Sequence, residues 1–404
     1  MSYLFTKAPK RRNTFMQRTP GVVRYNTPGE WQPLKLDSVL LYISFAFVLI
    51  GLLFTYSSSA FETSAYVKRQ LVFDVVGVTA ALFLSQTYLR IQKIKWLNPT
   101  VLLALTWVLL VIVLFTRSQA HTHRWIDLGV FKLQPSEIAK VTLVIYVADY
   151  LEKVSGKLAK NWKLLLQPMA VAGVTIGLIL AEKDIGTPAL MGAVFFTMLF
   201  VAGARVLHLC VPVASMVPLV LWQLIFVPYR RARILAFLHI GNQAENSTNY
   251  QVMQSFLAVG SGGWLGKGLG NSELKMQYLP AAHTDFIFSV MCEEIGLFVL
   301  LIVLGFCGIL IRGINLARVA KNTFNSLVIF GLTITICGQA FFNMAMAIGL
   351  LPTKGIALPF FSYGGSSVVM TLVMMGIILN LAAVDNTQNN LRDDVTHYKN
   401  RNRL

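Results

Sequence analysis

Residues 250–296 read YQVMQSFLAVGSGGWLGKGLGNSELKMQYLPAAHTDFIFSVMCEEIG, and the rest of the chain is arranged around this passage from a polar loop to an apolar helix. A glycine cluster at 260–270 is followed by Pro280, which interrupts regular structure. Thr284 is a candidate N-cap, and Asp285 would then lie in the first helical turn, where the helix dipole favours a carboxylate. Asp285 could act only as a capping residue, since Asp is common near helix starts. The remaining sequence has to decide between that role and a chemical one.

The chain as a whole is strongly apolar. Of its 404 residues 55% are hydrophobic and 13% are charged, whereas about 25% charged residues is usual. Apolar runs of about 20 residues, long enough to cross a bilayer core of about 30 Å, recur along its length. We therefore expect an all-α polytopic membrane protein with about ten transmembrane helices. Hydropathy places them at 38–58, 70–89, 97–116, 136–152, 165–181, 187–203, 207–228, 284–311, 325–349 and 364–384.

The net charge of +17 would suggest a nucleic-acid partner in a soluble protein. Here the positive-inside rule explains most of it, so we expect no nucleic-acid partner. With the N-terminus inside, most Lys and Arg residues fall in cytoplasmic segments. Both termini are then cytoplasmic, and the long loop 229–283 between helices 7 and 8 faces the outer, periplasmic side. We divide the chain into a disordered basic cytoplasmic arm at 1–36, a transmembrane domain at 37–384 that includes the loop, and a cytoplasmic tail at 385–404.

Familiar soluble-enzyme motifs are not found. Gly266-Lys267 is not a phosphate-binding P-loop, because Ser261 stands where its first glycine should be. His121 and His123 are too sparse for a zinc site without a nearby cysteine. The four cysteines lie in or beside apolar spans with no Cys-x-x-Cys spacing, which indicates small core residues.

Charged residues at membrane depth point to a first candidate site. The segment RWIDLG at 124–129 leads into QPSEIAK at 134–140, where Pro135 suits a helix start. Glu137 and Lys140 are three residues apart and share one helix face. They could form only an ion pair at the membrane edge. Ionisable groups at this depth are costly, however, and usually line a cavity.

Three other segments carry unusual residues. Glu182-Lys183-Asp184 can be read as a tight polar turn and is weak evidence alone. The run 351–367 has two prolines and adjacent glycines at a helix entrance, and irregular backbone in a membrane must be buried in protein or line a wet cavity. Arg230, Arg231 and Arg233 could meet lipid head groups, bind a pyrophosphate, or anchor a helix end.

These motifs resemble, in order, those of the SEDS family (shape, elongation, division and sporulation). The matching runs are RWIDLG, QPSEIAK, KDIGT, YQVMQS, GSGGWLGKGLG, LPAAHTDFIF with EEIG, and LPTKGIALPFFSYGGSS. The last run and residues 269–272 are more similar to the family's division branch than to its elongation branch. The resemblance implies a ten-helix glycosyltransferase that polymerises lipid II, an undecaprenyl-diphosphate-linked disaccharide-pentapeptide, into β-1,4 glycan strands.

The resemblance also implies residue roles. The family's functional acid falls on Asp285, and the substrate-binding residues implied or inferred here are Lys140, Glu137, Arg124, Arg230, Arg231, Lys354, Ser362 and His283. Two departures are visible. Ala281-Ala282 stand where the family commonly has Pro-Glu, and Glu182-Lys183 stand where it commonly has Gln-Pro.

The expected chemistry is an inverting transfer. Asp285 would take the proton of the acceptor hydroxyl, and Lys140, Arg124 or the arginines at 230–233 would stabilise the departing pyrophosphate. A divalent cation, Mg or Mn, is expected only at the level of the family. The expected location is the bacterial inner (cytoplasmic) membrane at the division septum. A class B penicillin-binding transpeptidase, other divisome membrane proteins and membrane lipid are the expected partners. A lipid II flippase and a scaffold that recruits a transpeptidase are the alternatives.

The outer loop 229–283 is expected to dock against the helix bundle and to contribute to the substrate cavity. About 55 residues without a disulfide or a metal would make only a marginal independent domain. Within it, residues 250–258 predict a short amphipathic helix at the membrane interface.

Overall fold

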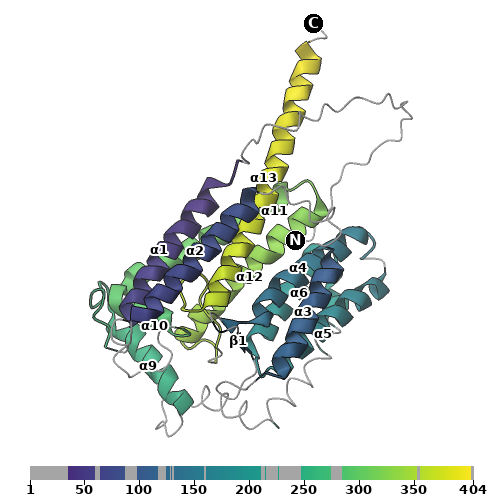
Figure 1. Ribbon diagram of the computed structural model, residues 1–404. Coiled ribbons are helices and arrows are strands. Elements are labelled where there is room, and N and C mark those ends of the chain that lie inside the picture. Colours follow the sequence, from purple (N-terminus) through teal and green to yellow (C-terminus); the bar gives the residue numbers. More distant parts are fainter. Residues whose placement is uncertain are drawn as a thin grey trace.

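The computed structural model describes residues 35–59, 64–86, 98–116, 124–127, 129, 132–158, 161–210, 214, 226, 247–273, 284–352 and 355–401, which are almost entirely helical (Figure 1). The α-helices are α1 (Ser38–Ser59), α2 (Ser64–Gln86), α3 (Pro99–Leu114), α4 (Pro135–Lys153), α5 (Leu166–Ala181), α6 (Gly186–Val201), α9 (Ser247–Ser261), α10 (Ile287–Ile295), α11 (Val299–Val319), α12 (Thr323–Ala347) and α13 (Gly365–Arg401). Short 3-10 helices, η2 (Trp162–Leu165) and η3 (Gly296–Phe298), precede α5 and α11. The strands β1 (Ile126–Asp127) and β2 (Lys132–Leu133) pair antiparallel.

Several of these helices have the length and composition of membrane spans. Five described stretches qualify, namely 38–58, 162–181, 287–319, 323–347 and 365–383, and α3 and α6 are shorter apolar helices. The apolar windows of α12 and α13 are 78% and 83% buried, whereas those of the other three are 28–39% buried. The helices α12 and α13 therefore lie at the centre of the bundle. The other three stretches expose apolar faces that suit lipid.

Figure 1 shows how the bundle is arranged around this centre. The helix α12 packs against α4, α6, α11 and α13, and α2 lies along α13. The helices α3, α5 and α6 pack around α4 on the other side. Nearly every residue of α4 is buried, including Glu137 and Lys140. Because α4 is surrounded by protein, Glu137 and Lys140 are kept out of the hydrocarbon that charged groups on a lipid-facing helix would meet.

Each span expected from hydropathy coincides with a helix, except 207–228, which lies largely outside the described residues. Several boundaries differ from the expectation. The helix α2 begins earlier, at Ser64, and α11 and α13 end later, at Val319 and Arg401. The helix expected at 284–311 is broken at Gly296 between α10 and α11. Gly296 has φ +54°, and a Cβ there would lie 2.5 Å from the backbone nitrogen of Gly266. The positive φ ends the helix at Gly296, and the close approach of Gly266 leaves no room for a side chain there.

The segment 247–273, part of the loop 229–283, docks on α10, as expected. The amides of Lys267 and Gly268 donate to the carbonyl oxygens of Glu293 and Glu294, at 2.9 and 3.0 Å. The amide of Leu297 donates to the carbonyl oxygen of Trp264 at 3.2 Å. These bonds attach the glycine-rich backbone to the bundle much as a strand attaches to a sheet edge. The helix expected at 250–258 is confirmed as α9.

The Glu293 carboxylate holds this segment through side chains. It lies 2.8 Å from the Lys267 ammonium and accepts from the Ser272 hydroxyl at 2.5 Å. Glu293 is 1% exposed, so these partners replace its water almost completely. None of residues 247–273 lines the cavity described below, however, and the expectation that they contribute to it is wrong for this part of the loop. The segment packs on α10 instead.

Hydrogen exchange can check this docking. We expect the amides of Lys267 and Gly268 to exchange slowly in the isolated protein in detergent. Glu293→Gln should speed their exchange about tenfold, because hydrogen bonds to a charged acceptor contribute about 1.5–3 kcal/mol. Glu273→Gln is the matched control, since Glu273 contacts the same lysine from a 74% exposed position. Fast exchange throughout 250–273 in the unmodified protein would contradict a preformed docked segment.

Candidate active site

A cavity of about 200 Å³ lies between α4, α12, the start of α13 and the segment that precedes α10. The residues that line it include Arg124, Glu137, Lys140, Asp285, Gln339 and Ser367. Four of these were predicted as site residues from sequence positions up to 161 residues apart, and the fold brings them together. The charged residues of the segment 124–140 and Asp285 therefore meet at one cavity.

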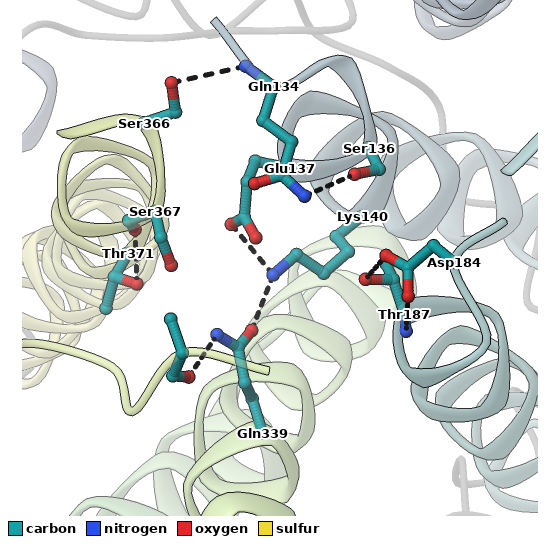
Figure 2. A network of polar contacts seen from close by, with 11 residues as sticks. Gln134, Ser136, Glu137, Lys140, Asp184, Thr187, Gln339, Ser366, Ser367 and Thr371 are labelled. Atoms are coloured by element: carbon teal, nitrogen blue, oxygen red, sulfur yellow. Dashed lines mark hydrogen bonds and ion pairs between the residues drawn. The ribbon is translucent and has the colours of Figure 1, made fainter. Parts of the chain in front are cut away.

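Lys140 forms a buried network at the floor of this cavity (Figure 2). Its ammonium lies 2.8 Å from the Glu137 carboxylate and donates to the Gln339 side-chain oxygen at 2.5 Å. The Gln339 amide nitrogen donates in turn to the carbonyl oxygen of Ala357 at 2.9 Å. The predicted ion pair of Glu137 and Lys140 is thus present. Lys140 is 2% exposed and lines the cavity, and its two partners fix the place of its ammonium.

Two amides on α12 were missed by the sequence analysis. Gln339 orients Lys140, and Asn343 donates its two amide hydrogens to the backbone oxygens of Asp285 (2.9 Å) and Ile356 (2.7 Å). The signal was available, because both are strongly polar residues four apart on one face of an otherwise apolar span. Polar side chains inside the membrane usually face the bundle interior.

Asp285 itself does not lie in the first turn of a helix. It belongs to a turn at 284–286, and α10 begins at Ile287 with Phe286 as its N-cap, so the expected cap at Thr284 is wrong. The reason is tertiary. The Ser362 hydroxyl donates to the Thr284 carbonyl oxygen at 2.6 Å, and Asn343 binds the next one, so these oxygens are taken out of the helical pattern. Asp285 is placed by α12 and by the 355–364 segment and does not act as a helix cap.

Arg124 faces Asp285 across Gly355. A Cβ on Gly355 would lie 3.2 Å from Asp285 Oδ2 and 3.6 Å from Arg124 Nη1, so both groups border the same small space. The other side of the guanidinium is anchored, because Nη2 donates to the Lys183 carbonyl oxygen at 2.8 Å and lies 3.7 Å from Asp184 Oδ1. Arg124 is therefore shared between the α5–α6 turn and the cavity.

The turn between α5 and α6 carries two buried acidic residues, Glu182 and Asp184. Asp184 caps α6, accepting from the Gly186 amide at 3.0 Å and from the Thr187 hydroxyl at 2.7 Å. Glu182 is fully buried beside it, and neither of its oxygens has a hydrogen-bond partner. Burial, and then the negative charge of Asp184, raise the pKa of Glu182 to about 8, although Arg124 acts to lower it. Glu182 is thus neutral at pH 7.

The other predicted site residues divide into two groups. His283, Arg230, Arg231 and Lys354 lie outside the described residues. Ser362 is described, but it is fully buried and does not line the cavity. Its oxygen accepts from the Leu358 amide at 2.6 Å while its hydroxyl donates to Thr284. The substrate-binding role predicted for Ser362 is therefore not supported, because both of its hydrogen-bonding functions serve the backbone.

The expected divalent cation has no protein cage in the part of the chain that the structure describes. No group of three or more His, Cys, Asp or Glu side chains gathers there in a way that could hold a metal ion. Mg²⁺ is commonly held by one or two carboxylates together with substrate phosphates. The cation remains a prediction, and Asp285 and Glu137 are the described carboxylates that line the cavity.

Gly355 gives a direct test of this geometry. In Gly355→Ala the new methyl group would occupy the space between Asp285 and Arg124, at 3.2 Å from the carboxylate. We expect activity to fall about tenfold, because small displacements of reacting groups are costly. The melting temperature should barely change. Gly173→Ala on α5 is the control, since its Cβ would meet nothing within 4 Å. Full activity in Gly355→Ala would show that this space is not used.

The bundle and its charged cavity define a multi-pass membrane protein with an internal ionic site. Comparison with known proteins gives its family. The family model described as "Cell cycle protein", which covers the FtsW, RodA and SpoVE proteins, matches residues 37–387. The chain therefore belongs to the SEDS family, of which FtsW and RodA are members.

Individual relatives agree with this assignment. The chain is 37% identical to a probable peptidoglycan glycosyltransferase FtsW of Geobacter metallireducens, covering 86% of this chain and 95% of that protein. It is 36% identical to the corresponding protein of Trichlorobacter lovleyi, over 87% and 95% of the two chains.

Solved structures give the same fold. One is a chain of a peptidoglycan synthase complex that coordinates polymerization and crosslinking, with a TM-score of 0.73 and 26% identity, covering 86% of this chain and 98% of that chain. Another is the rod shape determining protein RodA of Thermus thermophilus, with a TM-score of 0.64 and 26% identity over 87% and 98% of the two chains.

Proposed function

We propose that this protein is a peptidoglycan glycosyltransferase that polymerises lipid II into glycan strands at the division septum. The observation that carries the proposal is the meeting of Asp285 and Arg124 over Gly355, with Lys140 in the same cavity. A carboxylate beside two cations is what an inverting transfer from a lipid pyrophosphate requires. The likeness to proteins named as probable peptidoglycan glycosyltransferases supports the choice of substrate.

In the proposed step the acceptor sugar hydroxyl gives its proton to the Asp285 carboxylate. The hydroxyl oxygen then forms a bond to the anomeric carbon of the donor sugar, on the face opposite to the pyrophosphate. The bond from that carbon to the pyrophosphate oxygen breaks, and inversion converts the α linkage into a β linkage. One base is enough, because pyrophosphate leaves without prior protonation, unlike the leaving group in glycoside hydrolysis.

The two cations act on the departing charge. Arg124 Nη1 faces the space beside Asp285, and Lys140 lines the same cavity, oriented by Gln339. Both are anchored by protein groups and little reorganisation is needed when the negative charge develops. Arg230 and Arg231 are proposed as further pyrophosphate ligands at the outer rim. Their place in the site, like those of Lys354 and His283, rests on the sequence.

The septal location and the partners are part of the same proposal. The likeness to proteins named FtsW supports the division role. The likeness to a chain of a peptidoglycan synthase complex supports a class B penicillin-binding transpeptidase as partner. Other divisome membrane proteins would bind in the same assembly.

Purified protein in vesicles, with fluorescent lipid II and a class B transpeptidase partner, tests the proposal. We expect glycan strands that a β-1,4-specific muramidase digests. A flippase would move lipid II across the vesicle membrane without forming strands. A scaffold would bind the transpeptidase and do neither, and it would tolerate loss of every cavity charge. No strands under any condition would overturn the proposed function.

A further inference from the structure

Glu182 has no assigned role, yet it is the most unusual ionisable group near the cavity. It is 0% exposed, and both side-chain oxygens lack a hydrogen-bond partner. A buried carboxyl group without partners costs free energy and calls for an explanation. Its surroundings supply one, because Asp184 and Arg124 are both close enough to affect its ionisation.

Arg124 also has a buried polar atom without a hydrogen-bond partner. This atom is Nε, whereas Nη2 binds the Lys183 carbonyl oxygen and lies near Asp184. An unpaired donor on Arg124 and an unpaired acid on Glu182 thus occur in the same neighbourhood. While Glu182 is neutral, the guanidinium is divided between Asp184 on one side and the cavity on the other. A second negative charge at Glu182 would change that division.

We propose that Glu182 is a positioning residue that controls Arg124: the neutral acid leaves the guanidinium facing the cavity, and the ionised acid draws it toward the α5–α6 turn. The inference rests on the proposed function, since it gives Arg124 a pyrophosphate to bind. Ionised Glu182 and Asp184 together compete with the substrate for one cation. The substrate then binds more weakly, while the proton transfer to Asp285 is not directly altered.

In the part of the chain that the structure describes, few other ionisable groups surround this turn. The helices packed around this turn, α3, α5 and α6, carry no ionisable side chain. Lys183 follows Glu182 but is exposed, with φ +62°, which directs its carbonyl oxygen to Arg124. From α4, Glu137 and Lys140 face the cavity as an ion pair, and Asp285 faces Arg124 from the opposite wall. Among the described residues, Arg124 is therefore the cation that an ionised Glu182 would meet.

The test is the pH dependence of KM for lipid II, measured with the full-length protein and its transpeptidase partner. Between pH 7 and pH 9 we expect KM to rise about tenfold, as follows from one ionisation near pH 8 that blocks binding. In Glu182→Gln, KM should stay within about twofold over this range, because the amide cannot ionise. The kcat profiles of the two proteins should run parallel. Glu152→Gln, at the far end of α4, should keep the rise seen in the unmodified protein.

A second measurement does not need turnover. Binding of lipid II to Asp285→Asn should weaken with rising pH, and this weakening should disappear in Asp285→Asn with Glu182→Gln. Infrared spectra should lose a protonated carboxyl band between pH 7 and pH 9 that Glu182→Gln lacks.

The possible outcomes separate a failure of the positioning role of Glu182 from a failure of the proposed function. Parallel KM curves for the unmodified protein and Glu182→Gln, or a Glu182 that is already ionised at pH 7, would overturn the positioning role. An unmodified protein that forms no strands at any pH would instead overturn the proposed function, and the binding measurement would still report on Glu182.

Discussion

Asp285→Asn should lower kcat for strand synthesis by at least about a hundredfold, because a positioned general base contributes about 10²–10⁴-fold. Asn has nearly the size of Asp but cannot accept the proton of the acceptor hydroxyl. Asn343 binds the backbone oxygen of residue 285, not its side chain, so the turn at 284–286 should keep its shape. The measurement is the initial rate of glycan formation from lipid II by purified protein with its partner.

The controls for this experiment separate chemistry from folding. Expression, membrane insertion and melting temperature of Asp285→Asn should match those of the unmodified protein, and lipid II should still bind. Glu152→Gln removes a carboxylate at the far end of α4 and should leave the rate unchanged. Near-normal glycan strands from Asp285→Asn would exclude Asp285 as the base. They would then favour the flippase or scaffold alternatives.

Lys140→Met is the second large effect that we expect. Met keeps most of the length of the side chain and removes the cation. Loss of one preorganised group that stabilises developing charge typically lowers kcat by about 10²–10³-fold. The complication is Glu137, whose carboxylate would remain buried without its partner 2.8 Å away. Breaking a buried pair from one side costs about 3–5 kcal/mol of stability.

A double variant resolves this complication. Glu137→Gln with Lys140→Met carries no unpaired charge, so its melting temperature should recover most of what Lys140→Met loses. Its kcat should remain low, because the cation is still missing. If instead the double variant regains activity, then Lys140 serves only to balance Glu137, and the cation that stabilises the pyrophosphate must be sought elsewhere.

The sequence predicted the elements that depend on local composition. Spans such as α4 and α12 follow from apolar runs, and the ion pair of Glu137 and Lys140 follows from helical spacing. The short helix α9 in the loop 229–283 was predicted from its amphipathic pattern. The association of Asp285, Lys140 and Arg124 was predicted from the family motifs, and the cavity is where the structure joins them.

Features that depend on tertiary contacts could not be predicted in this way. Thr284 does not cap a helix, because Ser362 from 78 residues away takes its carbonyl oxygen. Ser362 resembles a substrate ligand because it lies in a serine- and glycine-rich run. Its hydroxyl instead binds the backbone of Leu358 and Thr284. The sequence around Glu182 indicates only a polar turn, because nothing in a short charged segment shows that one of its residues is fully buried.

The two amides of α12 have a mechanical consequence. Gln339 holds Lys140 and Asn343 holds the backbone of Asp285, and four residues of helix separate them by a rise of about 6 Å. Arg124 is fastened instead to the turn between α5 and α6. Lys140 belongs to α4 and Asp285 to the turn before α10, so the two amides of α12 link the lysine to the backbone of the base across three elements. A displacement of α12 would therefore disturb the contact of Lys140 and that of Asp285 at the same time, whereas the anchor of Arg124 on the α5–α6 turn would not be directly affected.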